Sequence, residues 1–246
     1  MEKIGSVEKL RRYPVKSMAG EEIAEAFAAY TGIVGDRVWS LVDKQKEQAN
    51  FPWFSARDAA ELIHFVPRFS AMPAVAIPYP VREQYAILVK TPDGAEYAID
   101  DPIFTAFLKE RFDRDLYARF SDRGSQDSRP LSLFGMATLR ALEKEMNISL
   151  DHRRFRANIY AAWDTNTAFY EDTLVGKKLQ IGEKLVIEIS KKDIRCQVIA
   201  LDPDTGEKNM SILSHVALRH ENCAGVYAVV LREGIVRRRD GIFLVS

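Results

Sequence analysis

Cys196 is the residue whose chemistry stands out in this sequence. It lies in the strand-like run Ile-Arg-Cys-Gln at residues 194–197, directly ahead of the acidic turn Asp-Pro-Asp-Thr-Gly-Glu at residues 202–207. Cys223 is the only other cysteine, so the chain cannot assemble a four-cysteine zinc or iron–sulfur site. A single thiolate can still act as a nucleophile or hold one soft metal ion.

The neighbours of Cys196 leave two interpretations open. Among apolar residues a cysteine is most often a buried, unreactive part of the core. The other interpretation is a reactive or metal-binding thiolate. Arg195 favours it, because a nearby guanidinium stabilises a thiolate, although neighbours on a strand point to opposite faces. Cys223 has no such neighbour, and we interpret it as structural. Free thiols are expected, because no export signal precedes them and the cytoplasm is reducing.

Polar clusters elsewhere in the chain could hold an anion. The motif Tyr-Pro-Val-Lys-Ser at residues 13–17 places an ammonium beside a hydroxyl at the end of a predicted strand, and both can turn toward a phosphate. On spacing alone, a solvated lysine followed by a turn serine explains the pair more simply. Arginines at the entry to strands, as in Gly-Asp-Arg-Val-Trp at residues 35–39, usually pair with surface carboxylates.

Other patterns fit known sites less well. His215 and His220 are five residues apart, which puts them on different faces of a helix and does not match the i, i+4 pair of a zinc helix. We interpret both as surface or satisfied polar residues. Asp-Thr-Gly at residues 204–206 resembles the aspartic-protease triplet, but it is a single copy after a proline, which favours a hairpin turn.

Composition limits the class of protein. The chain has 246 residues, 47% of them apolar, which is enough for one large or two small domains with a hydrophobic core. Its 35 basic and 35 acidic residues leave no net charge, which argues against nucleic-acid or anionic-membrane binding and makes any anion site local. Neither a signal peptide nor a membrane-spanning stretch is visible, so a cytoplasmic protein is expected.

The pattern of apolar runs predicts a mainly β protein with a few helices. Short runs bounded by turns predict strands at residues 4–10, 23–30, 38–42, 74–77, 85–89, 96–99, 158–163, 185–189, 198–201, 226–231 and 242–245. Helical spacing predicts helices at residues 103–112, 136–146 and 212–220. Strands and helices do not alternate regularly, so we expect an antiparallel barrel, of α+β class, and not a doubly wound sheet. The polar stretch 121–130 is expected to be a mobile connection between domains at 1–120 and 121–246.

Six motifs taken together resemble the MOSC family, named after the C-terminal domain of molybdenum cofactor sulfurase. They follow in the family's order over nearly the whole chain, and although each is weak alone, six in sequence are specific. They are Tyr-Pro-Val-Lys-Ser at 13–17, Gly-Asp-Arg-Val-Trp at 35–39, Arg-Phe-Arg-Ala-Asn-Ile at 154–159, Val-Gly at 175–176 with Ile-Gly at 181–182, Arg-Cys at 195–196, and Asp-Pro-Asp-Thr-Gly at 202–206. The resemblance implies a small N-terminal β-barrel-like domain packed on a MOSC-type antiparallel β-barrel.

By layout the chain resembles the mitochondrial amidoxime reducing component and its bacterial relatives. That resemblance implies a molybdenum–molybdopterin cofactor, which purified protein from a heterologous host can lack, and reduction of small N-hydroxylated substrates. Cys196 would be the catalytic residue and the protein ligand to molybdenum. The implied cofactor-binding residues are Lys16, Ser17, Arg37, Arg156, Asn158, Arg195 and Tyr227. Some relatives append a ferredoxin-like domain, and its absence here implies a separate electron-donor protein.

Three residues depart from the family's pattern. Ala157 stands where a proline is usual, Ile194 stands where a small polar residue is usual, and Arg239 stands where glycine is expected before an aspartate. These departures affect fine geometry and substrate choice more than cofactor binding.

Two other functions remain open from the sequence. In the first, Cys196 carries a persulfide received from a pyridoxal-phosphate-dependent desulfurase and delivers it to a metal centre. The pyridoxal phosphate would then belong to the partner, because this chain lacks the layout of an aminotransferase-type domain. In the second, the protein is a degenerate barrel that binds a ligand without turnover.

Overall fold

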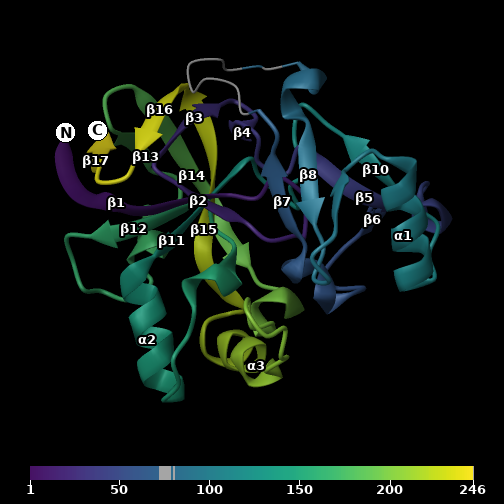
Figure 1. The fold of residues 1–246 in the computed structure, drawn as a ribbon. Helices are drawn as coiled ribbons and strands as arrows, with labels where there is room; N and C mark the ends of the chain where they lie inside the picture. Colours follow the sequence, from purple (N-terminus) through teal and green to yellow (C-terminus); the bar gives the residue numbers. More distant parts are fainter. Residues whose placement is uncertain (72–78, 80, 246) are drawn as a thin grey trace.

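The largest sheet of the protein closes on itself as a barrel. The computed structural model describes residues 1–71, 79 and 81–245. Seven strands follow one another around the barrel in the order β12, β11, β15, β14, β13, β17 and β1, and pairing of β1 with β12 closes it (Figure 1). Their bounds are β1 (Glu2–Arg12), β11 (Leu131–Gly135), β12 (Ile159–Trp163), β13 (Lys178–Ile181), β14 (Leu185–Ile194), β15 (Cys223–Arg232) and β17 (Gly241–Val245). Only the β11–β12 pair is parallel, so the predicted antiparallel barrel is confirmed.

The barrel strands alternate between buried apolar side chains and partly exposed ones, and the buried set forms the barrel core. Along β14, Leu185, Ile187 and Ile189 are fully buried, while the residues between them are partly exposed. Because successive strand residues point to opposite faces, this alternation sends one set into the barrel core and the other outward. Closure leaves this part of the sheet with no unpaired edge.

The described residues form three smaller sheets besides the barrel; in Figure 1 the sheets that contain β5 and β8 lie to its right, and β16 and β3 of the other sheet lie at the top. The first contains β10 (Leu116–Phe120), β5 (Trp39–Asp43) and β6 (Trp53–Phe54); the second β16 (Gly234–Arg237), β3 (Glu25–Ala29) and β4 (Gly32–Ile33); the third β7 (Val66–Phe69), β8 (Ile87–Lys90) and β9 (Glu96–Ala98). A further strand, β2 (Glu21–Ile23), pairs with the end of β1. Trp39, Phe54 and Phe65 are buried in a second hydrophobic core that these sheets share with α1.

Three α-helices occur in the described residues, and all three were predicted. They are α1 (Pro102–Phe112), α2 (Met136–Met146) and α3 (Met210–Arg219). The side chain of Asp101 caps α1 by accepting a hydrogen bond from the Ile103 amide at 2.8 Å, and Asn209 caps α3 in the same way. The short 3-10 helices are η1 (Lys44–Lys46), η2 (Ala60–His64), η3 (Arg82–Tyr85), η4 (His152–Phe155), η5 (Tyr170–Leu174) and η6 (Gln197–Ala200). No helix in the described part of the chain has the length and apolar character that crossing a membrane requires.

Some predicted strands differ from the structure. The strand predicted at 198–201 is wrong, because that segment forms η6; a four-residue apolar run does not distinguish a strand from a helical turn. The run at 23–30 is divided between β2 and β3, and the run at 74–77 lies outside the described residues. Seven strands of the described residues were not predicted: β4, β6, β7, β10, β11, β13 and β16.

The two halves of the chain share sheets. β1, from the N-terminal half, lies in the barrel between β12 and β17, and β16, from the C-terminal half, pairs with β3. The boundary at residues 120/121 stays a prediction. For the site, the consequence is that residues following β1 lie next to residues from β12, β14 and β15.

Candidate functional site

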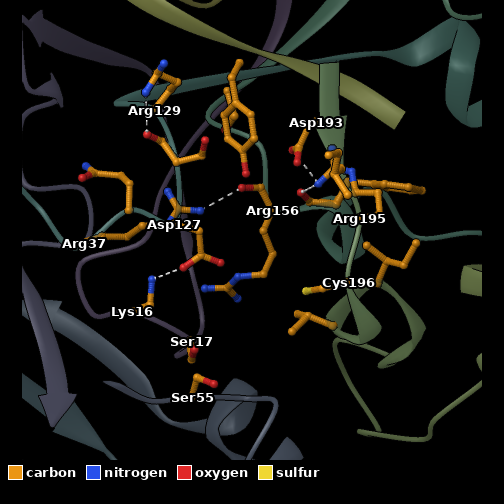
Figure 2. A pocket seen from close by; sticks show the side chains of 18 of the residues that line it. Lys16, Ser17, Arg37, Ser55, Asp127, Arg129, Arg156, Asp193, Arg195 and Cys196 are labelled. Carbon is orange, nitrogen blue, oxygen red and sulfur yellow. Dashed lines mark hydrogen bonds and ion pairs between the residues drawn. The ribbon is translucent and has the colours of Figure 1, made fainter. Parts of the chain in front are cut away.

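The residues implied by the family resemblance gather around one pocket. Its cavity volume is about 230 Å³, and all eight predicted site residues line it. They are Lys16, Ser17, Arg37, Arg156, Asn158, Arg195, Cys196 and Tyr227. Figure 2 shows Cys196 with its sulfur pointing into the pocket, on the side opposite Lys16 and Asp127. The geometry therefore brings the thiol and the proposed anion-binding groups together; their roles stay predictions.

Three of these residues have a left-handed backbone. The φ angles are +68° at Ser17, +53° at Arg37 and +51° at Arg156. This region costs a residue other than glycine about 1–3 kcal/mol, and it persists only where surrounding contacts fix it. Here the Arg37 amide donates to the Tyr13 carbonyl at 2.6 Å, and the Arg156 amide donates to the Arg153 carbonyl at 3.2 Å. The tight turns direct the two arginine side chains to the same cavity.

Lys16 is a buried cation of the pocket lining that pairs with a carboxylate, Asp127. Its side chain is 6% exposed, donates to the Ser125 carbonyl at 2.6 Å and forms an ion pair with Asp127. The ammonium also lies 4.5 Å from the centre of the Trp53 ring. Burial lowers the pKa of Lys16 to about 8, because desolvation disfavours the charged form more than Asp127 favours it.

Arg37 and Arg156 differ in how their charges are balanced. Arg37 forms an ion pair with Asp36 and donates to the Arg156 carbonyl at 3.0 Å. Arg156 donates to the Met18 carbonyl at 2.8 Å and lies over the Tyr13 ring, but no carboxylate of the described residues pairs with it. Burial, and secondarily the charge of Arg37, lowers the pKa of Arg156 to about 10. An anion in the pocket would supply the missing counter-charge.

Arg195 is anchored by the barrel but keeps one free donor. Its Nε donates to the Ala224 carbonyl at 2.6 Å, and its Nη1 reaches the Phe155 carbonyl and Asp193 Oδ2, both at 2.9 Å. Its Nη2 is buried and has no hydrogen-bond partner among the described residues. Because buried donors are nearly always paired, this one is available to a ligand in the pocket.

Asp193 and Tyr227 complete the floor around Arg195. Burial raises the pKa of Asp193, although the charge of Arg195 opposes the shift. Burial and the negative charge of Asp193 also raise the pKa of Tyr227. Tyr227 therefore keeps its hydroxyl proton over the physiological pH range and is available as a hydrogen-bond donor.

Arg57 is a further cation close to the thiol. Cys196 is partly exposed and is the N-cap residue of η6. Burial opposes the charge of Arg57, but a hydrogen bond with Cys196 and the nearby Asp127 outweigh that effect and raise the pKa of Arg57. Arg57 also forms an ion pair with Asp127 at 2.7 Å. A guanidinium at this position places a positive charge near the sulfur, where a metal-bound or reacting sulfur would carry negative charge.

Replacing Arg57 with methionine should slow alkylation of Cys196. Loss of the guanidinium removes a positive charge beside the reacting sulfur, so the rate with iodoacetamide at neutral pH is expected to fall roughly threefold or more. Mass spectrometry of the modified peptide measures the rate at each cysteine separately. Cys223 is the internal control: burial raises its pKa, so it should react more slowly and at the same rate in both proteins. Equal rates at Cys196 would rule out a role of Arg57 in activating the thiol.

Positive charge dominates the lining. The four predicted cations are joined by Arg57, Arg129, Arg154, Lys191 and Lys192, whereas Asp127 and Asp193 are the only lining carboxylates among the described residues. A protein without net charge has concentrated its cations at this place. The arrangement suits a ligand that carries several negative charges and presents a soft metal to the sulfur.

Several lining residues were missed by sequence reasoning. Arg57 was not predicted to belong to the site, and Asp127 lies in the segment 121–130 that was expected to be a mobile connection. The segment is instead held by specific contacts. The Ser125 amide donates to the Arg37 carbonyl at 2.8 Å, and Asp127 forms ion pairs with Lys16 and Arg57. No local spacing links these residues to Cys196, because the tertiary fold alone brings them together.

Comparison with known proteins gives a consistent result for the family. The model of the MOSC N-terminal beta barrel domain matches residues 4–99, and the model of the MOSC domain matches residues 121–242. Comparison with the curated proteins finds no match.

The solved structures that match this chain are distant in sequence. The YuaD protein from Bacillus subtilis is 11% identical with a TM-score of 0.47, and the match covers 97% of this chain and 94% of that one. YiiM from Geobacillus stearothermophilus is 16% identical with a TM-score of 0.37, over 48% of this chain and 55% of that one. On the strength of the two matched domain models, the chain belongs to the MOSC family, which is linked to molybdenum-cofactor-binding proteins.

Proposed function

We propose that this pocket binds a molybdenum–molybdopterin cofactor and that the protein reduces small N-hydroxylated or related N-oxygenated compounds. One observation carries the proposal: a partly exposed free thiol and a large excess of cations line the same cavity. Neither feature alone is distinctive. Their combination matches a ligand with an anionic phosphate at one end and a soft metal at the other.

The residues present fit such a group. Arg156 lacks a carboxylate partner among the described residues, and Arg195 Nη2 is a buried donor with no partner among them. Lys16 and Ser17 add an ammonium and a hydroxyl close to them, and Asn158 is a buried amide at the same wall. These donors would hold the phosphate and the pterin, and the sulfur of Cys196 would be the ligand that the protein gives to molybdenum.

The reaction consumes two electrons and two protons. An N-hydroxy compound loses its oxygen as water and leaves the corresponding N–H compound, and the bound cofactor supplies this redox chemistry. The protein binds and orients the cofactor, keeps bulk water away from its buried end and presents the substrate to the exposed end. A separate electron-donor protein is part of the proposal.

The departures from the family pattern bear on substrate choice. Ile194 lines the pocket next to the thiol segment and is 68% exposed, so it gives the mouth an apolar surface where a small polar residue is usual. Ala157 is fully buried behind the lining. Arg239 has a φ of +71°, a conformation that glycine adopts without strain, which explains why the pattern expects glycine there.

Anion binding by the cofactor-free protein should depend on pH through Lys16. Its pKa of about 8 in the folded protein lies below its unfolded value, so Lys16 is charged below pH 8 and loses that charge as the pH rises. The charged fraction falls from about nine-tenths at pH 7 to about one-tenth at pH 9. Sulfate affinity, measured by calorimetry, should therefore fall several-fold over this range. Sulfate is the suitable probe because its own charge does not change there.

Lys16→Arg provides the control for this pH dependence. Arginine keeps the positive charge at every pH used, so the loss of affinity between pH 7 and 9 should disappear in that variant. An identical pH dependence in Lys16→Arg would show that another group is responsible.

The competing function is sulfur transfer by a persulfide on Cys196. The exposure of the thiol and the adjacent Arg57 are compatible with it. It gives no role to Arg156 or to the donor of Arg195, which lie deeper in the same cavity, and for that reason we favour the cofactor. Incubation with a pyridoxal-phosphate-dependent desulfurase and cysteine, followed by mass spectrometry, tests for the persulfide directly. A stoichiometric persulfide on protein that takes up no cofactor would reverse this preference.

A further inference from the structure

A cluster of two histidines and one glutamate lies away from the pocket. His215 Nε2 and His220 Nε2 each lie 2.7 Å from the same oxygen, Oε2 of Glu145. The three atoms are all within 4.8 Å of one another. Glu145 belongs to α2, His215 belongs to α3, and His220 follows the last residue of α3. The fold therefore brings together a glutamate and two histidines that form no motif in the sequence.

This corrects the interpretation of the two histidines from their spacing. On a continuous helix, residues five apart point in different directions. The helix ends at Arg219: the His220 amide still makes the helical hydrogen bond to the Val216 carbonyl at 3.0 Å, but the backbone of His220, with φ −134° and ψ 33°, has left the helical conformation. The imidazole of His220 then stacks on Phe169 with 4.1 Å between ring centres, which fixes its orientation toward Glu145.

We infer that Glu145, His215 and His220 form a binding site for one divalent transition-metal ion of the zinc type. Two neutral imidazoles and one carboxylate are a donor set that zinc prefers, with bonds of about 2.0–2.2 Å. Ligand atoms around a tetrahedral ion at that distance lie about 3.4 Å apart. Movement of the three side chains by about 1 Å reaches this geometry. All three are partly exposed, so an ion can enter and water can take the fourth position.

The position of the cluster indicates a structural role. A bound ion would join the end of α2 to the end of α3. α3 packs on η6, the short helix whose N-cap residue is Cys196. Ile199 of η6 belongs to the same hydrophobic cluster as Ile212 and Val216 of α3. The ion would thus steady the helix that supports the thiol, without itself entering the pocket.

Zinc titration of the chelator-treated full-length protein tests the site. Calorimetry should give one equivalent of Zn²⁺ per chain, and His215→Gln, His220→Gln and Glu145→Gln should each weaken binding at least about tenfold. Glu221→Gln is the matched control: it removes an exposed carboxylate beside His220 and should leave the affinity unchanged. Mg²⁺ should not compete, because it prefers oxygen ligands.

Two further measurements guard against misfolded variants and against zinc bound by thiols. Zn²⁺ should raise the melting temperature of the wild-type protein and of Cys196→Ser, but not that of Glu145→Gln, whose side chain keeps its size. Co²⁺ should give the intense visible spectrum of a tetrahedral ion without sulfur-to-cobalt charge-transfer bands. The inference is overturned if zinc binding is lost in Cys196→Ser and kept in the histidine variants, or if the wild-type protein binds zinc no more tightly than Glu145→Gln.

Discussion

Cys196→Ser should lose at least about a thousandfold in the rate of amidoxime reduction, equal to about 4 kcal/mol of transition-state stabilisation. A hydroxyl is a harder and more weakly donating group than a thiolate, and it is not ionised at neutral pH, so it cannot replace the sulfur on a soft metal. The assay uses cofactor-loaded protein, an aromatic amidoxime as substrate and a reduced viologen dye as electron donor. The rate is expressed per bound molybdenum, which separates turnover from cofactor content.

Cys223→Ser is the matched control for this experiment. Cys223 starts β15, is buried, and does not line the pocket. The same substitution there should leave the rate per molybdenum within about twofold of the wild-type value, because surface and packing changes away from the site do not alter the reacting groups. Retention of activity in Cys196→Ser would refute the role of this sulfur.

Arg156→Met should weaken retention of the cofactor at least about tenfold. Hydrogen bonds to a charged group contribute about 1.5–3 kcal/mol, and Arg156 has no carboxylate of the described residues to neutralise it in the empty pocket. Methionine keeps much of the length of the side chain and removes its charge. The amount of pterin released after gel filtration, compared with the amount that stays bound, measures the effect.

Arg154→Met is the control for Arg156→Met. Arg154 lines the same pocket, but its guanidinium is already paired with Asp202 at 2.6 Å and bonded to the Ala200 carbonyl. Loss of a neutralised charge should change cofactor retention much less than loss of Arg156. Equal effects in the two variants would mean that total charge, and not the unpaired guanidinium, holds the ligand.

The fold could be predicted in outline because local patterns determine much of it. The caps of α1 and the helical spacing of α2 and α3 depend on residues within one or two turns, and these helices were placed to within about two residues. Short segments carry less information. The run at 198–201 forms a helical turn because the chain must turn between Cys196 and the bridge from Leu201 to Lys208, which no local pattern reveals.

The site shows a similar division. The family resemblance predicted eight residues that the fold brings to one pocket, seven of them in the six motifs, although β1 and β14 are far apart in the chain. Arg57 and Asp127 were not assigned, because their function depends on contacts with Cys196 and Lys16 that form only in the tertiary structure. Glu145 lies on another helix from the histidines that it contacts, so spacing along one helix could not connect them.

The central claim is that the pocket holds one molybdenum cofactor with the sulfur of Cys196 on the metal. The most direct test is to purify the wild-type protein and Cys196→Ala from cells that make molybdopterin and to measure molybdenum per chain by mass spectrometry. Close to one molybdenum per wild-type chain, and a large loss in the variant, is the predicted result. A wild-type protein without molybdenum from cells in which a known molybdoenzyme is fully loaded would contradict the account.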